Sequence, residues 1–152
     1  MTKKNQYIGR LEGLLTHLKN TKLEYLKAAD QLNNSEHKRH LNQQAILRNR
    51  FFQEILKELH RLGMTLDNLV ISRFNFDQLL ISSIDILQVS AIEKCIQSDA
   101  YLLEKYNEIQ VEFESVSEID LFSACEKIKD AIEKNQFLID NFASKSRIHS
   151  IF

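Results

Sequence analysis

The turn residues that β-sheets need are almost absent from this chain. Its 152 residues include no proline and only three glycines, Gly9, Gly13 and Gly63. Because glycine and proline supply most tight turns, long helices are favoured over a sandwich or a doubly wound sheet. Hydrophobic residues make up 43% of the sequence, which is enough for the core of one domain. We therefore predict an all-α fold, with one helical bundle over residues 1–144 and a frayed tail over residues 145–152.

Apolar residues recur at helical spacing in four long segments. The predicted helices cover residues 5–32, residues 36–62 with Ser35 as N-cap and Gly63 at the end, residues 89–113, and a fourth segment capped by Ser115 or Ser117. The stretch 68–87 is apolar around much of its circumference, so we predict a shorter helix there that crosses an end or side of the bundle. Its apolar surface also predicts a homodimer through that face.

The charges are nearly balanced, with a formal net charge of -1. No global field therefore attracts nucleic acid or an anionic membrane. The sequence has no apolar run of about 18 residues, so we expect neither a membrane span nor a secretory signal. Cys95 and Cys125 lack a CxxC spacing, and we expect them to be buried, reduced thiols. These features predict a cytoplasmic protein without a cofactor, a nucleic-acid partner or a membrane partner.

Lys22 interrupts an otherwise apolar stripe on the first predicted helix. The stripe contains Ile8, Leu11, Leu15, Leu18, Lys22, Tyr25, Ala29 and Leu32. A charge at such a position is costly unless it is paired or reaches solvent. A weak internal repeat, with Lys22 and Asp99 each preceding a tyrosine, suggests that these two side chains face each other. Arg48 falls near the centre of the apolar face of the second helix, which predicts a second inward-pointing cation.

The segment Leu18–Asp30 resembles the first helix of small bacterial ferritin-like proteins of unknown function, which are distant relatives of rubrerythrin. The resemblance continues from Leu41 to Gly63, resumes around Cys95 and Tyr106, and covers roughly two-thirds of the chain. It implies a ferritin-like four-helix bundle with an additional crossover helix between the second and third main helices.

The same resemblance implies that a di-metal site has been lost. In metal-binding members of the superfamily, two helices each give a Glu and two others each give a Glu-x-x-His. At these positions the chain carries Lys22, Leu47 with Arg50, Asp99, and Glu133 with Gln136. A lysine and a leucine in place of bridging carboxylates do not hold two cations. The resemblance therefore implies an interior polar cluster of Lys22, Arg48, Asp99, Glu133 and Gln136 instead of a metal centre.

The sequence favours a non-catalytic interaction protein, and the resemblance alone implies an association with stress. One alternative is a di-iron oxidoreductase or ferroxidase. Another is a histidine phosphotransfer module that uses His17, although its spacing to Lys19 differs from the usual His-x-x-Lys-Gly motif. His37 and His40 lie one helical turn apart, but Lys38 and Arg39 beside them predict a solvated basic helix start and not a metal site.

Overall fold

The computed structural model describes residues 2–65 and 85–151, with side chains described as far as Phe142 except at residues 85–87. These residues form four helices: α1 (Lys3–Gln31), α2 (Ser35–Arg61), α3 (Asp85–Phe113) and α4 (Leu121–Ile151). The described ranges contain no strand, which confirms the all-α prediction. The predicted crossover helix and the dimer face on it fall outside the described residues, apart from positions 85–87, which belong to α3.

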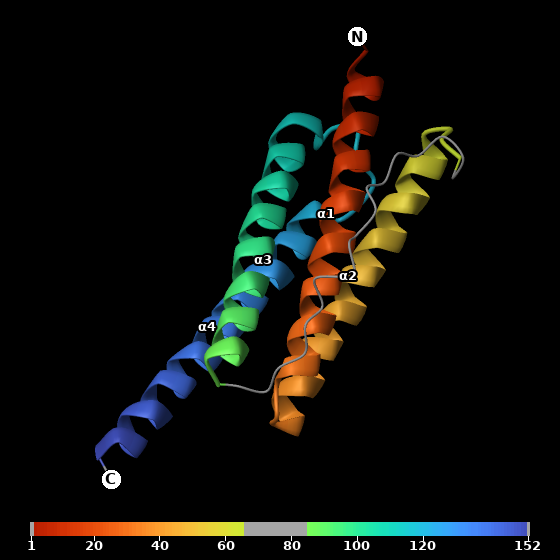
Figure 1. Cartoon of the computed structure of the whole chain (residues 1–152). Helices are drawn as coiled ribbons and strands as arrows, with labels where there is room; N and C mark the ends of the chain where they lie inside the picture. Colours follow the sequence, from red (N-terminus) through yellow and green to blue (C-terminus); the bar gives the residue numbers. More distant parts are fainter. Residues whose placement is uncertain (1, 66–84, 152) are drawn as a thin grey trace.

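The helices form two antiparallel hairpins, α1 with α2 and α3 with α4 (Figure 1). α1 packs against both α2 and α3, and α3 packs against α4. α2 and α3 run in the same direction, so α2 ends at one end of the bundle and α3 begins at the other. The chain between Thr65 and Asp85 therefore joins opposite ends. This agrees with the long connection that the sequence predicts between the second and third main helices.

Side-chain caps fix the first two helices close to their predicted limits. Thr2 accepts a hydrogen bond from the amide of Asn5 at the start of α1. Asn34, and not the predicted Ser35, caps α2 by accepting from the amides of Glu36 and His37 at 2.9 and 3.0 Å. Gly63 ends α2 in the left-handed region at φ 92°, and the amide of Met64 returns to the carbonyl of Leu59 at 2.9 Å. Gly63 is thus the helix-terminating residue that the sequence predicts.

The other two helices differ more from their predicted limits. α3 begins at Asp85, earlier than the predicted residue 89. The predicted caps Ser115 and Ser117 are wrong, because Asp120 accepts from the amide of Ser123 at 2.9 Å and α4 starts only at Leu121. α4 then continues to Ile151, through the region predicted as a frayed tail, and extends past the end of the bundle (Figure 1). No glycine or proline occurs in this stretch to end the helix.

A layer of polar side chains divides the core into two apolar clusters. One cluster joins the first half of α1, the second half of α2, the second half of α3 and the start of α4. The other joins the opposite halves of the same helices. Between them lies what we call the polar layer, with one or more buried side chains from every helix: Thr21, Tyr25, Arg48, Asp99 and Asn135. Within the described residues, no helix combines the length and apolarity needed to cross a bilayer.

Candidate functional site: the buried polar layer

An ion pair between Arg48 and Asp99 forms the centre of the polar layer. Both side chains are fully buried, with 0% of their surface exposed. Arg48 donates to both carboxylate oxygens of Asp99, from Nε at 3.0 Å and from Nη2 at 2.8 Å. This two-point geometry is the strongest arrangement for an arginine and a carboxylate. It joins α2 to α3, which are not among the extensively packed helix pairs.

Tyr25 and Asn135 extend the pair to the two remaining helices. The hydroxyl of Tyr25 donates to Oδ2 of Asp99, and the side-chain amide of Asn135 donates to that hydroxyl at 2.8 Å. Oδ1 of Asn135 lies 3.0 Å from Nε2 of His40, which therefore donates the hydrogen. The guanidinium of Arg48 also lies 5.0 Å from the ring centroid of Tyr25, within cation–π range. Hydrogen bonds thus run from the half-buried His40 to the centre of the bundle.

The electrostatics of the layer favour a charged pair. Burial alone lowers the pKa of Arg48, but the neighbouring Asp99 carboxylate outweighs burial and raises it. Burial raises the pKa of Asp99 above its ordinary value, although the charge of Arg48 and the hydrogen bonds from Arg48 and Tyr25 oppose that rise. Three donated hydrogen bonds converge on this carboxylate, two from the permanently charged Arg48 and one from the Tyr25 hydroxyl, so the ionised form is the one that fits the geometry. Burial, followed by the Asp99 charge, raises the pKa of Tyr25 well above its ordinary value, and Tyr25 therefore remains a donor.

The structure brings together only part of the predicted interior cluster. Arg48 and Asp99 meet in the core, as the sequence suggests for each of them separately. Glu133 and Gln136 lie on the exposed side of α4, where Gln136 bonds to Asp140. The predicted contact of Lys22 with Asp99 is wrong, because Lys22 is half-buried and donates to Asn49 at 3.3 Å. The buried residue of α4 at this level is Asn135, which the sequence analysis missed.

Thr21 takes the core position on α1 that the stripe assigned to Lys22. The steps 18–21–25 and 18–22–25 both cover two helical turns, so sequence spacing alone does not separate them. Thr21 is fully buried and shares a 2.6 Å hydrogen bond with Ser98 of α3. The short side chain of Thr21, whose hydroxyl is hydrogen-bonded to Ser98, fits between α1 and α3. The longer side chain of Lys22 lies to one side of this contact.

Replacing Lys22 with methionine is expected to change the free energy of unfolding by less than about 1 kcal/mol. Its ammonium makes one long hydrogen bond from a half-buried position, and the aliphatic stem is retained in methionine. Urea unfolding of the two proteins measures the difference. A loss above about 3 kcal/mol would show that Lys22 pairs with a buried charge after all.

A second buried carboxylate, Glu58, ties the end of α2 to α1 and to the α3–α4 turn. It accepts from the hydroxyl of Tyr7 at 2.6 Å, from Nε of Arg61 at 2.6 Å and from the amide of Glu118 at 2.9 Å. Burial opposes the charged form of Glu58. The donors Arg61 and Tyr7, helped by the Glu118 amide, outweigh burial and lower its pKa. The sequence analysis did not single out Glu58, whose role depends on partners far away in the sequence.

The lowered pKa of Glu58 predicts a specific pH dependence. Its charged form adds stability above the unfolded-state pKa of about 4.3, and that contribution disappears as the pH falls through the lower folded-state pKa. We expect Glu58→Gln to cost about 1–3 kcal/mol at pH 7 and progressively less below about pH 4. Urea unfolding at a series of pH values measures both proteins. A difference that stays constant down to about pH 2 would contradict the assignment.

His17 lies apart from the polar layer, on the surface between α1 and α3. Its ring packs edge-on against Tyr101, with centroids 4.6 Å apart. Partial burial, together with the nearby charge of Lys105, lowers the pKa of His17. A groove of about 190 Å³ at this point is also lined by Arg10 and Lys105. His17 is thus a neutral imidazole beside two cations.

The residues of the polar layer do not fit a di-metal centre. The guanidinium of Arg48 fills the space between α2 and α3 and uses both oxygens of Asp99. Its permanent positive charge repels a dication at the same place. No group of three or more His, Cys, Asp or Glu side chains in the described part of the chain is placed to hold a metal ion. Comparisons with protein-family models, with curated proteins and with solved structures find no match to this chain.

Proposed function

We propose that this chain is a cytoplasmic, non-catalytic ferritin-like bundle that has lost a di-metal site and acts as an interaction or stress-associated protein. The observation that carries the proposal is the fully buried, two-point ion pair between Arg48 and Asp99. It stands midway between the two apolar clusters, where side chains from all four helices meet. A ferritin-like protein with a metal centre needs acids and imidazoles on these inner faces.

The topology supports the ferritin-like part of this proposal. Two antiparallel hairpins are joined so that α2 and α3 run in the same direction, which requires one long connection (Figure 1). Ferritin-like bundles have one such connection, whereas up-down-up-down bundles use short loops throughout. This shared topology supports descent from a metal-binding ancestor.

The buried thiols offer no alternative chemistry. Burial and then the nearby Asp99 charge raise the pKa of Cys95 well above its ordinary value. Burial also raises the pKa of Cys125, whose thiol lies 3.4 Å from Oδ1 of Asn107. A reactive cysteine needs a lowered pKa and access to substrate. Both residues therefore fit the role of packing side chains, as the sequence predicts.

Metal analysis tests the proposal against the di-iron alternative. Untagged protein purified from iron-supplemented cells is expected to contain far less than one iron, manganese or zinc ion per chain. The His60→Gln variant, at an exposed site near the end of α2, serves as a control for weak binding of metal at the surface. About two metal ions per chain in both proteins would overturn the proposal.

A second candidate, histidine phosphotransfer at His17, is favoured by one observation. Arg10 and Lys105 line the same groove as His17, and cations near a histidine stabilise a phosphoryl group on it. One observation argues against phosphotransfer: Arg10 lies 3.4 Å from Glu108, whose carboxylate already neutralises part of the Arg10 charge. We expect no label on His17 after incubation with a labelled phosphodonor and a response regulator. Labelling of the protein that is lost in the His17→Gln variant would establish this candidate instead.

A further inference from the structure

Charge is distributed unevenly between the two hairpins of this bundle. Residues 1–65 contain 12 Lys and Arg against 6 Asp and Glu, whereas residues 85–142 contain 5 Lys and Arg against 13 Asp and Glu. The first range forms α1 and α2, and the second forms α3 and the larger part of α4. The small net charge of the whole chain therefore combines a basic hairpin with an acidic one.

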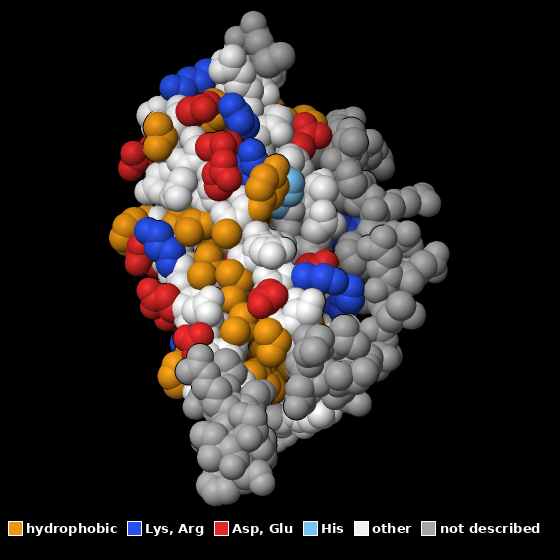
Figure 2. All heavy atoms as spheres, turned by 60° about the vertical axis from the view of Figure 1, so that its left-hand side comes forward, with side chains coloured by type: hydrophobic (Ala, Val, Ile, Leu, Met, Phe, Trp, Pro, Cys, Tyr) orange, Lys and Arg blue, Asp and Glu red, His pale blue; other side chains and the backbone are white. Residues whose placement is uncertain are grey.

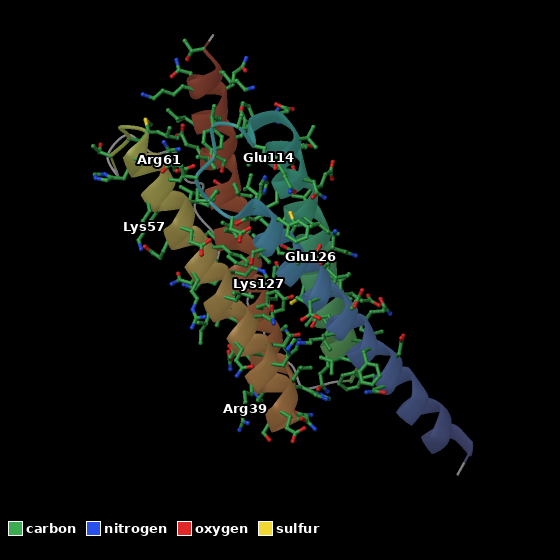
Figure 3. The ribbon with its side chains drawn as sticks, turned by 180° about the vertical axis from the view of Figure 1, so that it is seen from behind. Arg39, Lys57, Arg61, Glu114, Glu126 and Lys127 are labelled. Atoms are coloured by element: carbon green, nitrogen blue, oxygen red, sulfur yellow. The ribbon has the colours of Figure 1, made fainter. Side chains whose placement is uncertain are left out.

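The cations of α2 lie along its outer face. At about 100° per residue, four exposed cations fall within about 40° of one another around the helix, and we call them the basic line: Arg39, Arg50, Lys57 and Arg61. Figure 3 shows three of them along the length of α2. Arg48, which points to the bundle centre, lies on the opposite side of the helix. The two exposed acids of α2, Glu36 and Glu54, lie about 60° from Arg39, at one edge of the basic line.

The outer face of α3 is acidic. Three acids lie within about 60° of one another around the helix, on the side away from the core: Glu93, Glu104 and Glu108. The two cations of α3, Lys94 and Lys105, lie about 100° or more from Glu93. A groove of about 580 Å³ follows this face, and its lining includes acidic and apolar side chains: Glu104, Glu108, Glu112, Ala100, Leu103 and Val111. Figure 2 shows acidic and hydrophobic side chains together on this side of the molecule.

The two faces point in opposite directions within one molecule. α1 lies between α2 and α3, which run in the same direction (Figure 1). The ion pair between Arg48 and Asp99 places residue 48 of α2 approximately level with residue 99 of α3. A second copy that is displaced sideways, without rotation, therefore brings its α2 alongside α3 of the first copy, with both helices parallel and nearly level.

We propose that copies of this chain associate side by side, with the basic line of α2 on the acidic face of α3 of the next copy. This inference rests on the proposed role as an interaction protein. An axial offset of three residues, about 4.5 Å, aligns the charges of the two helices. Arg50 then lies opposite Glu104. Arg39 lies opposite Glu93, because both pairs of like charges are 11 residues apart on their own helices.

The same register also covers apolar surface. Ile46, which is 56% exposed between the cations of α2, comes opposite Ala100 in the lining of the groove. Lys57 comes opposite the 85% exposed Val111 and within one turn of Glu108. Glu108 already contacts two cations of its own molecule at 3.4 and 3.6 Å, so the contacts of Arg39 and Arg50 supply most of the charge attraction.

No two acids oppose each other directly in this register. Glu54 of α2 has the same sequence offset as Glu108 of α3, but the two lie at opposite edges of the contact. In a parallel pair of facing helices, side chains turned in the same sense from the contact line fall on different sides of it. Glu54 therefore lies beside the neutral Asn107, and Glu108 lies beside the neutral Gln53.

A second copy fits these faces better than a nucleic acid does, because the acidic hairpin repels a polyanion while another molecule supplies both charges. Each contact uses different faces of the two copies, and a sideways displacement without rotation does not close into a ring. The end copies therefore keep one free face each. We expect reversible chains that lengthen with protein concentration and shorten with salt.

Sedimentation velocity of the full chain tests this contact. At about 100 µM protein and about 50 mM NaCl, the wild type is expected to form species larger than a dimer, and about 500 mM NaCl to raise the dissociation constant at least tenfold. Arg50→Glu and Glu104→Lys are each expected to raise it at least tenfold as well. Lys127→Glu, at an exposed site on α4, changes the net charge as much as Arg50→Glu does and is the matched control, expected to leave association unchanged.

Mixing the two single variants tests the pairing itself. An equimolar mixture of Arg50→Glu and Glu104→Lys is expected to associate as the wild type does, because every contact between the two variants again joins opposite charges. The double variant Arg50→Glu/Glu104→Lys is expected to associate for the same reason. Thermal melts followed by circular dichroism verify that these variants of exposed residues are folded. A mixture of folded variants that stays monomeric would overturn the pairing of positions 50 and 104.

The remaining outcomes separate this inference from the proposed function. A wild type that stays monomeric at about 100 µM in low salt would overturn the side-by-side contact. Association that stops at a dimer, or that both single variants leave intact, would also overturn it. Metal content measured on the same samples decides the loss of the di-metal site independently. A metal-free monomer would therefore remove this contact and leave the non-catalytic bundle in place.

Discussion

Replacing Asp99 with asparagine is expected to destabilise the bundle by about 3–5 kcal/mol. The variant keeps the shape of the side chain but leaves the Arg48 guanidinium buried without a counter-charge. Two charge-assisted hydrogen bonds, at 3.0 and 2.8 Å, become weaker neutral ones. Urea unfolding at pH 7, followed by circular dichroism, measures the loss. Asp140→Asn, at an exposed site on the same bundle, is the matched control and is expected to change stability by less than about 0.5 kcal/mol.

Removing both charges is expected to restore much of that stability. In the double variant Arg48→Met/Asp99→Leu, no charge remains to be desolvated and apolar side chains extend across the centre of the layer, between the two apolar clusters. Buried ion pairs replaced by apolar residues of similar volume are often neutral or stabilising. A double variant that is less stable than Asp99→Asn would contradict this explanation, because it would show that the cost does not come from an unpaired buried charge.

Replacing Tyr25 with phenylalanine is expected to cost about 1–3 kcal/mol. The missing hydroxyl removes a donor to Asp99 and an acceptor for the Asn135 amide, and both groups are buried. The same unfolding experiment measures this loss. Tyr101→Phe, on the half-exposed tyrosine of α3, is the control and is expected to change stability by less than about 0.5 kcal/mol. Equal effects at the two tyrosines would contradict a structural role for the Tyr25 hydroxyl.

The sequence predicts the four helices because their signals are local. A chain without proline, with regular apolar spacing and with Gly63 after the second stripe, limits the fold to long helices. The helix starts are less accurate because neighbouring polar residues compete as caps. Asn34 replaces Ser35, and Asp120 replaces the earlier serines. In each case several side chains are chemically suitable, and the path of the loop decides between them.

The sequence predicts only some of the residues of the polar layer. The sequence predicts a buried Arg48 because it is a cation on the apolar face of its helix. Asp99 is likewise an ionisable residue on the apolar face of α3. Asn135 carries no charge and Tyr25 resembles an ordinary core residue, so neither attracts attention without its partners. The predicted inward position of Lys22 is wrong for a simple geometric reason. One residue of helical phase decides whether Thr21 or Lys22 faces the core, and a heptad spacing allows both.

The most direct test of the central claim is nitrogen-15 NMR of the Arg48 side chain, with and without Zn²⁺. The buried ion pair predicts a slowly exchanging Nε–H signal, because this hydrogen is buried and donated to Asp99 at 3.0 Å. Adding about two equivalents of Zn²⁺, a metal that carboxylate and imidazole sites bind, is expected to leave the signal unchanged. A fast-exchanging signal, or one that shifts and saturates near two equivalents, would show that the centre of the bundle is open to solvent or metal and would contradict this account.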